Sequence, residues 1–471
     1  MEPTTDITSA GEFLADAARI IERFLEIEEA PPAPPLPVED AAARFDLELP
    51  ARGVGDEAAL ERLLALVEAT PPTAGPRFVN QLFAGRERVA TAADMIASAL
   101  NTSMYTYKAA GPQILVERAL LMHMLDKAGM TGGDGMFTPG GSLSNLAAMI
   151  IARNEMVPGA REDGLDARGR IVYVSAESHY SIRKNANMIG VGRSAVRPVA
   201  VDERGRMRPD ALEAAVAADR AAGRRPMMIV ATSGTTVMGA FDPLAPLADI
   251  AQREKLWLHV DGAFGGTALL HERTRPLLDG LGRADSFTWD AHKTMGVPLT
   301  CSVVLTRKPG LMRTHFDETA PYLFQHDYDD EQAWINPGVK SLQCGRRNDA
   351  IKLWAQWQAL GDAGYTARVE KQLALARTAA DIVRSDDRFV LSCEPDWLTV
   401  CFEVRGKPSD EICDALNRSG ELKVGYGIVH GRRVIRLATI NPSHSEGDIE
   451  RMMADIAAAA AGVDDADNSV N

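Results

Sequence analysis

Five short apolar runs alternate with helical stretches in the middle of the chain, and this pattern limits the possible folds more than any other feature. The runs are RIVYVSA (170–176), PMMIVAT (226–232), LWLHVD (256–261), SFTWD (286–290) and CSVVLT (301–306), and helical periodicity covers 142–156, 209–222 and 244–254. Strands that are apolar at nearly every position are buried on both faces, so the pattern predicts an α/β fold with a mainly parallel sheet flanked by helices. Functional side chains in such folds collect at the carboxyl ends of the strands.

The N-terminal part has a different texture. Residues 10–29 carry an apolar stripe at helical spacing, and residues 57–69 form a second amphipathic pattern. Between them the proline-rich stretch APPAPPLP (30–37) is expected to be a stiff link, because proline fixes φ and lacks an amide donor. We therefore expect an N-terminal helical segment, residues 1–75, whose apolar stripe covers another subunit or the chain's own core.

After residue 345 the pattern changes again. It predicts a long helix over 348–382, strands near 398–404 and 432–438, and a final helix over 446–460. We therefore expect a large domain over residues 76–345 and a smaller C-terminal α+β domain over residues 346–471, whose acidic last ten residues fray. A length of 471 residues exceeds what one core usually serves, which agrees with more than one packed unit.

Composition excludes several classes of function. The chain has 51 Lys and Arg against 65 Asp and Glu, a net charge of −14 without an evident basic patch, so neither nucleic acid nor an anionic membrane is an expected partner. The five cysteines are widely spaced without a C-x-x-C pair, which signals neither a disulfide framework nor a metal site and favours reduced, buried thiols. We recognise no signal peptide and no apolar run of roughly 18 residues, so a cytoplasmic location is the default expectation.

Three predicted strands end in polar side chains. LWLHVD ends in Asp261, a carboxylate at the rim of an apolar sheet that should face a cation or a protonated donor, although an aspartate that caps a turn fits equally well. VYVSAESHYS leads to His179, which could be a ligand, a base or a packed ring, and a lone histidine here is more often structural. IVATSGTT brings hydroxyls to Thr232 and its neighbours, which suits polar ligand contacts or an ordinary turn.

Two further motifs add a candidate phosphate site and a lysine to these strand ends. In FTPGGSLSN a glycine pair and Ser142 precede an apolar helix, which favours a phosphate site, with helix capping by Ser142 or Ser144 as the alternative. In DAHKTMG, Lys293 is a long cation in an apolar neighbourhood. A lysine, a carboxylate, a stacking ring and an anion site are the groups that pyridoxal phosphate requires. The strand ends therefore predict a pyridoxal phosphate site.

The same stretches carry a resemblance to a known family. In chain order they are PRFVNQLFAG (76–85), SMYTY (103–107), FTPGGSLSN (137–145), SHYSI (178–182), ATSGTTVMGAFDP (231–243), LWLHVDGAFGG (256–266), DAHKTMG (290–296), YLFQ (322–325) and QCGRRND (343–349). Through them the chain resembles the group II pyridoxal-phosphate-dependent decarboxylases, particularly the branch of glutamate, aspartate and cysteine sulfinate decarboxylases. The resemblance implies a fold-type I enzyme with a seven-stranded sheet in its large domain, and a homodimer whose active site lies at the interface.

The resemblance also implies how the cofactor is held. Lys293 would carry it covalently, Asp261 would pair with its pyridine nitrogen, and His179 and Ala263 would cover the two faces of its ring. The residues near its phosphate and its polar edge would be Gly141, Ser142 and His292 for the phosphate, and Thr232 for the edge.

The residues that meet the substrate follow in the same way. Arg436 would grip the α-carboxylate, and Gln81 and Phe83 would line the side-chain pocket. Loss of carbon dioxide would be followed by return of a proton to Cα, for which Tyr328 in a lid over residues 324–341 is the candidate donor.

Three departures from the family pattern stand out. Asp261-Gly262-Ala263-Phe264 replaces the usual Asp-Ala-Ala-Trp, and Asp290 adds a carboxylate that either tunes Lys293 or caps a turn. Lys108 stands where relatives carry glutamate, and it either faces the pocket or is an ordinary surface lysine.

The substrate is expected to be small and acidic. Phe83 resembles the aspartate and cysteine sulfinate branch, and its bulk favours aspartate or a three-carbon sulfinate or phosphonate analogue, with glutamate and 2,4-diaminobutyrate as alternatives. An aminotransferase or another lyase on the same scaffold would release a keto acid as the main product. A catalytically silent dimer partner is the other rival, and the complete set of Lys293, Asp261 and His179 argues against it.

Overall fold

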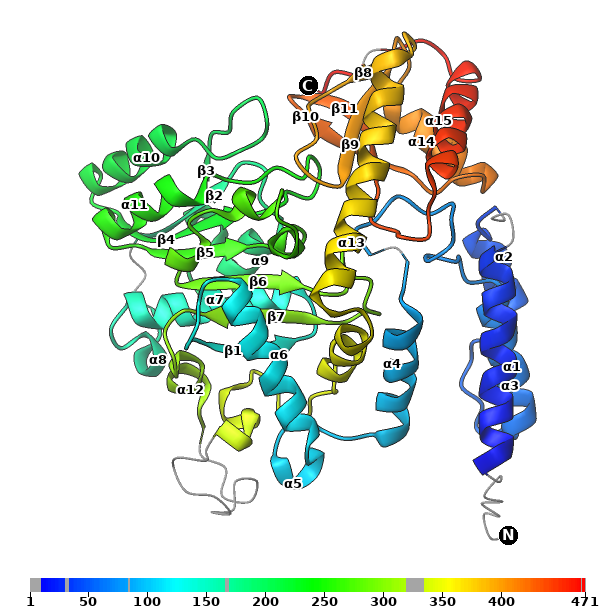
Figure 1. Cartoon of the computed structure of the whole chain (residues 1–471), viewed down its shortest axis with the longest axis horizontal. Coiled ribbons are helices and arrows are strands. Elements are labelled where there is room, and N and C mark those ends of the chain that lie inside the picture. Colours follow the sequence, from blue (N-terminus) through cyan, green and yellow to red (C-terminus); the bar gives the residue numbers. More distant parts are fainter. Residues whose placement is uncertain are drawn as a thin grey trace.

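A seven-stranded sheet lies at the centre of the large domain (Figure 1). The computed structural model describes residues 10–29, 34–83, 85–165, 169–318, 334–466 and 468–470. The strand order is β1-β7-β6-β5-β4-β2-β3, with bounds β1 Asp134–Thr138, β2 Arg170–Ser175, β3 Val196–Val199, β4 Arg225–Thr232, β5 Trp257–Asp261, β6 Ser286–Asp290 and β7 Ser302–Thr306. Only β7 runs against its neighbours β6 and β1, so the prediction of a mainly parallel sheet is confirmed.

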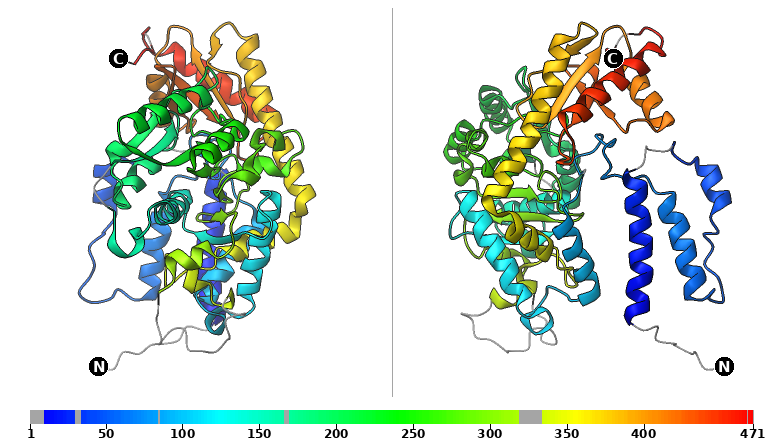
Figure 2. Two further views of the ribbon diagram at one scale, coloured as in Figure 1. Left: turned by 90° about the vertical axis from the view of Figure 1, so that its left-hand side faces the viewer. Right: turned by 45° about the vertical axis from the view of Figure 1, so that its right-hand side comes forward.

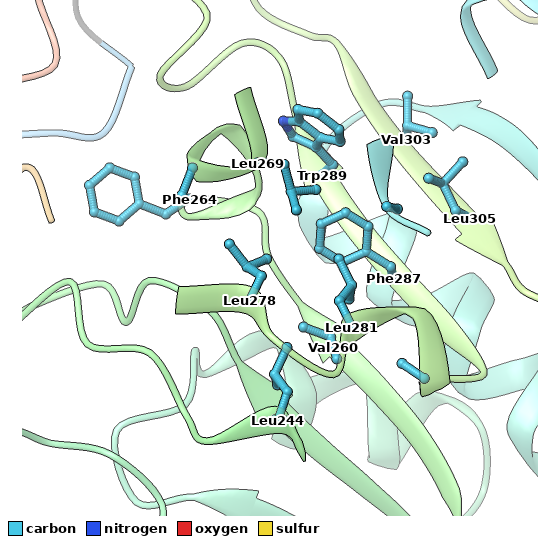
Figure 3. Packing of buried hydrophobic residues seen from close by; sticks show 14 of the residues in the cluster. Leu244, Val260, Phe264, Leu269, Leu278, Leu281, Phe287, Trp289, Val303 and Leu305 are labelled. Carbon is cyan, nitrogen blue, oxygen red and sulfur yellow. The ribbon is translucent and has the colours of Figure 1, made fainter. Parts of the chain in front are cut away.

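Helices cover both faces of this sheet. One core cluster contains residues of α6 (Gln113–Lys127), α10 (Pro209–Ala221) and α11 (Leu244–Glu254), and another contains residues of α7 (Gly141–Met156) and α9 (Ser181–Met188). Successive β4 side chains enter opposite clusters, Ala231 the first and Val230 the second, as the period of two requires. Figure 3 shows the first cluster, where Phe287 and Trp289 of β6 lie among aliphatic side chains. The sheet is therefore buried on both faces, as predicted.

The other elements of this part are short. They are the helices α4 (Arg88–Leu100), α5 (Tyr107–Ala110), α8 (Ala160–Asp163) and α12 (Leu311–Phe316), and the 3-10 helices η1 (Arg193–Ala195), η2 (Gly266–Leu270), η3 (Arg275–Leu278), η4 (Leu281–Arg283) and η6 (Pro337–Lys340).

A second sheet forms the centre of the C-terminal part (Figure 1). Its four strands are antiparallel in the order β10-β11-β9-β8, with bounds β8 Phe389–Leu391, β9 Thr399–Val404, β10 Gly425–Val429 and β11 Arg432–Ala438. The helices α14 (Ser409–Ser419) and α15 (Glu446–Ala461) pack on it, and a capping box of Ser445 and Asp448 begins α15. The long helix α13 (Ala350–Ser385), which turns at Gly361 where φ is 61°, contacts α4 and α6 of the large domain and α15 of the small one.

The N-terminal helices stand beside the rest of the chain (Figures 1 and 2). They are α1 (Ala10–Glu29), α2 (Val38–Arg44) and α3 (Asp56–Glu68). The ion pairs Arg19–Glu61 (3.0 Å) and Arg23–Glu68 (2.7 Å) join α1 to α3, and neither α2 nor α3 buries a residue. We call α1 and α3 the N-terminal helix pair. Ile20 is buried, whereas Leu14, Leu25, Leu63 and Leu66 of this pair face solvent in a single chain.

The end of the chain differs from the expectation. Among the last residues, Asn468 is buried rather than frayed, since its amide donates to Glu403 Oε2 (3.0 Å) and to the Lys407 carbonyl (2.8 Å). All five cysteines are unpaired, and Cys344 is exposed rather than buried. No helix of the described ranges is long and apolar enough to cross a membrane.

Candidate active site

Three of the expected site residues lie side by side at one edge of the large sheet. Thr232 ends β4, Asp261 ends β5, and the strand register pairs Thr232 with Asp261 and Asp261 with Thr288 of β6. His179 lies in the turn between β2 and α9. The carboxyl ends of parallel strands meet at one edge, which is why residues far apart in sequence come together here.

Asp261 is a buried carboxylate with two neutral donors. The Asn145 amide donates to its Oδ2 at 2.8 Å, and the Ala263 backbone N–H donates to its Oδ1 at 3.1 Å. Neither donor cancels the negative charge, so the site keeps an anion that can face a cation. An aspartate that only caps a turn would not need the Asn145 side chain of α7, a helix that packs across β4, β5 and β6.

The small residues after Asp261 are required by close packing. A Cβ on Gly262 would lie 2.3 Å from the Phe287 ring, and a Cβ on Gly266 would lie 2.8 Å from Trp289. Glycine therefore replaces the alanine expected at position 262 because the β6 aromatic side chains fill that space. Ala263, the expected ring contact, is buried immediately beyond it.

Lys293 forms an ion pair with the additional carboxylate. Its Nζ lies 3.4 Å from Asp290 Oδ2, and its side chain is 21% exposed, so the amine is mostly covered but accessible. Asp290 is fully buried at the end of β6. The expectation of a buried lysine is correct in outline, and the surroundings are more polar than the apolar sequence suggests.

Asp290 also ends a chain of buried hydroxyls. Ser302 donates to its Oδ1 at 2.5 Å, Ser144 lies 2.7 Å from Ser302, and Thr138 lies 2.5 Å from Ser144. Because a carboxylate only accepts, the donation runs in one direction from Thr138 to Asp290. Asp290 therefore does more than cap a turn. The suggested cap by Ser144 is wrong, since its hydroxyl belongs to this chain and α7 has no side-chain cap.

The start of α7 carries two glycines and packs closely on the site. Gly140 precedes it with φ at 117°, and a Cβ on Gly141 would lie 2.7 Å from Asp290 Oδ2 and 3.1 Å from Ala263. Ser142 is exposed and its carbonyl accepts from Asn185 at 2.9 Å, which holds the first turn in place. His292 lies nearby, with Nδ1 2.9 Å from the Cys301 carbonyl and Nε2 3.5 Å from Asp290 Oδ2. Burial lowers the pKa of His292, and the Asp290 charge opposes that shift.

His179 is within electrostatic reach of the charged groups. Burial is the largest influence on its pKa and lowers it, while Asp261 and Asp290 act to raise it and Lys293 acts to lower it. Its Nδ1 lies 2.8 Å from the Ser181 hydroxyl, which orients the ring. The structure therefore brings His179, Asp261 and Lys293 into one site with a neutral imidazole at neutral pH.

Arg436 reaches this region from the small domain. It lies on β11, donates from Nη1 to the Thr236 carbonyl at 2.8 Å and from Nη2 to the Asn80 carbonyl, and its Nε has no acceptor among the described residues. Burial lowers its pKa. The contact with Asn80 places Arg436 next to the segment that contains the expected pocket residues, of which Gln81 is exposed and Phe83 is half-buried.

Of the remaining expected residues, Tyr328, the candidate proton donor, lies outside the described residues. Lys108 is exposed on α5 in a single chain, at the end of the molecule away from β11 (Figure 1). Sequence reasoning missed Asn145, although it follows Gly141 by four positions and so lies on the same helix face.

The residues present fit pyridoxal phosphate. The Thr232 hydroxyl is buried without a partner among the described residues, which is costly unless a ligand meets it. An accessible lysine, an unneutralised carboxylate, a neutral imidazole and a helix start with two glycines supply the chemistry that the cofactor needs. No group of three or more potential metal ligands occurs in the described ranges.

Comparison with known proteins agrees with this site. The model of the pyridoxal-dependent decarboxylase conserved domain matches residues 60–405. The chain is 39% identical to cysteine sulfinic acid decarboxylase of Mus musculus over 440 residues, 89% of each chain. It is 36% identical over 478 residues to acidic amino acid decarboxylase GADL1 of Homo sapiens, covering 96% of this chain and 92% of the relative. The crystal structure of mouse CSAD superposes with a TM-score of 0.90 at 35% identity, covering 97% and 99% of the two chains.

Proposed function

This chain belongs to the pyridoxal-dependent decarboxylase family, and from that membership we propose that it removes the α-carboxylate of a small acidic L-amino acid. The favoured substrates are aspartate, cysteine sulfinate and similar three-carbon acids, which would yield the amine and carbon dioxide. Relatives named for cysteine sulfinic acid and for acidic amino acids support an acidic substrate. The bulk of Phe83 supports the shorter side chain.

One observation carries the proposal: Lys293, Asp261 and His179 meet at one sheet edge, beside a Thr232 hydroxyl that has no partner in the described part of the chain. We assign Lys293 to the covalent link with pyridoxal phosphate, Asp261 to its ring nitrogen, and His179 and Ala263 to its two faces. The phosphate and the polar edge would be held by Gly141, Ser142, His292 and Thr232. When bound, the cofactor supplies an electron sink for the bond to the α-carboxylate.

The chain's own residues would then orient the substrate and supply the proton that returns to it. Arg436 would hold a substrate carboxylate through its free Nε, while the Thr236 and Asn80 carbonyls keep the guanidinium in place. The Asp290 carboxylate, 3.4 Å from the Lys293 amine, would orient that amine. We assign the proton that returns to Cα to Tyr328.

We further propose that the enzyme is a homodimer with its active site at the interface. The apolar side chains of the N-terminal helix pair, among them Leu14 at 63% exposure, need a cover that a single chain does not provide. A second copy would supply that cover. Five unpaired cysteines support a cytoplasmic location, and the net charge of −14 supports neither nucleic acid nor an anionic membrane as a partner.

The test is carbon dioxide release by the purified holoenzyme from a panel of amino acids. We expect the highest kcat/KM with aspartate or cysteine sulfinate, lower values with glutamate, and the lowest with 2,4-diaminobutyrate. Lys293→Ala should abolish release and the visible colour of the bound cofactor. A keto acid as main product would identify an aminotransferase and contradict the proposal.

A second variant separates the substrate from the reaction class. Phe83→Ser should shift the ratio of kcat/KM for glutamate over aspartate upwards by about 10- to 200-fold, because one methylene in a pocket is worth about 1–3 kcal/mol. Ser443→Ala, an exposed position in the small domain, is the control and should leave the ratio unchanged. An unchanged ratio in Phe83→Ser would remove Phe83 from the substrate pocket.

A further inference from the structure

Behind Asp261 lies a continuous chain of buried polar side chains. Trp257, His259 and Asp261 project from one face of β5, because alternate residues of a strand share a face. Ser286 and Thr288 of β6 lie opposite them, in the register His259 with Ser286 and Asp261 with Thr288. Asn145 of α7 joins the two strands. Each of these residues is almost fully buried, so each polar atom needs a partner within the protein.

The contacts form an unbroken path. Trp257 Nε1 lies 2.9 Å from Ser286 Oγ, and Ser286 Oγ lies 2.8 Å from His259 Nδ1. On the other side of the ring, His259 Nε2 lies 3.0 Å from Asn145 Oδ1, which also accepts from Thr288 Oγ1 at 2.8 Å. Asn145 Nδ2 then donates to Asp261 Oδ2 at 2.8 Å. We call this path the polar chain.

The chemistry of its two ends sets the direction of every bond. Asp261 only accepts, so Asn145 turns its amide hydrogens to Asp261 and its Oδ1 to His259. The His259 ring must then carry a proton on Nε2. In a neutral ring Nδ1 accepts from the Ser286 hydroxyl, which itself accepts the indole N–H of Trp257. Burial lowers the pKa of His259 to about 4, which agrees with a neutral ring.

We propose that His259 and Asn145 are positioning residues that hold Asp261 as an ionised acceptor for the protonated ring nitrogen of the cofactor. The polar chain fixes the His259 tautomer, the tautomer fixes the Asn145 amide, and the amide leaves the Asp261 charge uncompensated. A cation in place of Asn145 would compete for that charge. The inference rests on the proposed function, since it concerns the cofactor assigned there.

The decisive experiment compares two ligands on the apoenzyme. Apparent dissociation constants are measured by fluorescence titration for pyridoxal phosphate and for an analogue in which CH replaces the ring nitrogen. We expect His259→Met to weaken pyridoxal phosphate by about 10- to 100-fold, the range typical of supporting partners in a bound site, and to leave the analogue within a few-fold. His259→Gln keeps a donor near Nε2 and should restore most of the affinity.

Equal losses for both ligands would overturn the inference, because a merely structural role would disturb the site whatever the ring carries. An unchanged affinity for pyridoxal phosphate in His259→Met would overturn it as well. Thr288→Val, which removes one donor to Asn145 with little change of shape, provides the same comparison if His259→Met does not fold. It should show a smaller loss, again confined to pyridoxal phosphate.

A measurement without any ligand keeps this inference separate from the proposed function. NMR spectra are recorded of apoenzyme whose histidines carry nitrogen-15. The signals that are present in wild type and missing in His259→Gln belong to His259, and at about pH 7 they should show a neutral ring protonated on Nε2. A ring protonated on Nδ1 would overturn the polar chain. Failure of the wild type to bind pyridoxal phosphate, with the predicted tautomer observed, would instead contradict the proposed function.

Discussion

At the carboxyl edge of the large sheet, buried carboxylates have partners within the chain, whereas in the N-terminal helix pair several leucines are exposed and surface ion pairs join the two helices. Asp261 and Asp290 each have donors within the same chain, at 2.8 Å and 2.5 Å. In α1, by contrast, Leu14 and Leu25 are 63% and 44% exposed. The buried charges at the sheet edge have partners within one chain, although the Thr232 hydroxyl has none among the described residues. The exposed leucines of the helix pair are expected to be covered only on assembly, because exposed apolar surface of this kind marks an interaction site.

The largest expected effect concerns the N-terminal helix pair. Leu14→Glu combined with Leu25→Glu should weaken self-association by about 3–6 kcal/mol, since burial of one leucine is worth about 1.5–3 kcal/mol. Analytical ultracentrifugation would show the dimer dissociating at concentrations where the wild type remains paired. Ala214→Glu with Ala218→Glu on the exposed face of α10 adds the same charge and should change nothing. A double leucine variant that stays dimeric would remove the helix pair from the interface.

A slightly smaller effect concerns the core of the large sheet. Trp289→Ala should lower the free energy of unfolding by about 3–5 kcal/mol, because it leaves a cavity beside Phe287 in the cluster of Figure 3 and removes the hydrogen bond from Trp289 Nε1 to the Thr267 hydroxyl (3.1 Å). Urea unfolding of the apoenzyme at two protein concentrations measures it. The loss should be the same at both, unlike that of the leucine variant. Tyr426→Ala, at 49% exposure, is the control and should stay within about 0.5 kcal/mol of wild type.

The smallest effect concerns pH. The pKa of His259 is about 4 in the folded protein against an ordinary value of 6.5, so between these values the unfolded chain binds a proton that the folded chain does not. Stability should therefore fall as pH drops through this window, by about 1.4 kcal/mol per unit and about 3 kcal/mol in all. Asp242, whose pKa is raised to about 7 by burial, has the opposite effect on stability as pH drops. Asp242 is present in both wild type and His259→Gln, so its contribution cancels when the two are compared.

The difference between wild type and His259→Gln isolates this one proton. Stabilities measured by urea unfolding across the window should give a shallower slope for the variant by about one proton. Parallel slopes would show that His259 is protonated in the folded protein, which would also contradict the direction of the polar chain.

The central strands could be predicted from sequence because burial on both faces makes them apolar throughout. The predicted runs match β2, β4, β5, β6 and β7 to within about a residue at most ends. The edge strands β1 and β3 are missing from the prediction. β1 contains Gly135 and β3 contains Arg197 and Pro198, as edge strands tolerate, so neither has a continuous apolar signal.

Some residues of the candidate site could likewise be predicted from sequence and others could not. Residues that follow a strand, such as Asp261, His179 and Lys293, could be predicted because strand ends meet at one edge. Asn145 and Ser302 could not, because their contacts depend on the register between α7 and the sheet, which no local pattern records. The roles of the site residues and the domain boundaries at 75 and 345 stay predictions, and Tyr328 lies outside the described residues.

The position of Arg436 has a consequence for how such an enzyme can change over generations. Arg436 belongs to the small sheet and Lys293 to the edge of the large one, so the α-carboxylate and the cofactor would be held by separate cores. Substitutions where the two cores meet, at the contacts of Arg436 with Thr236 and Asn80, would change the angle between the carboxylate and the cofactor without replacing either residue. Lineages could thus change which bond at Cα reacts while every reacting side chain is inherited intact.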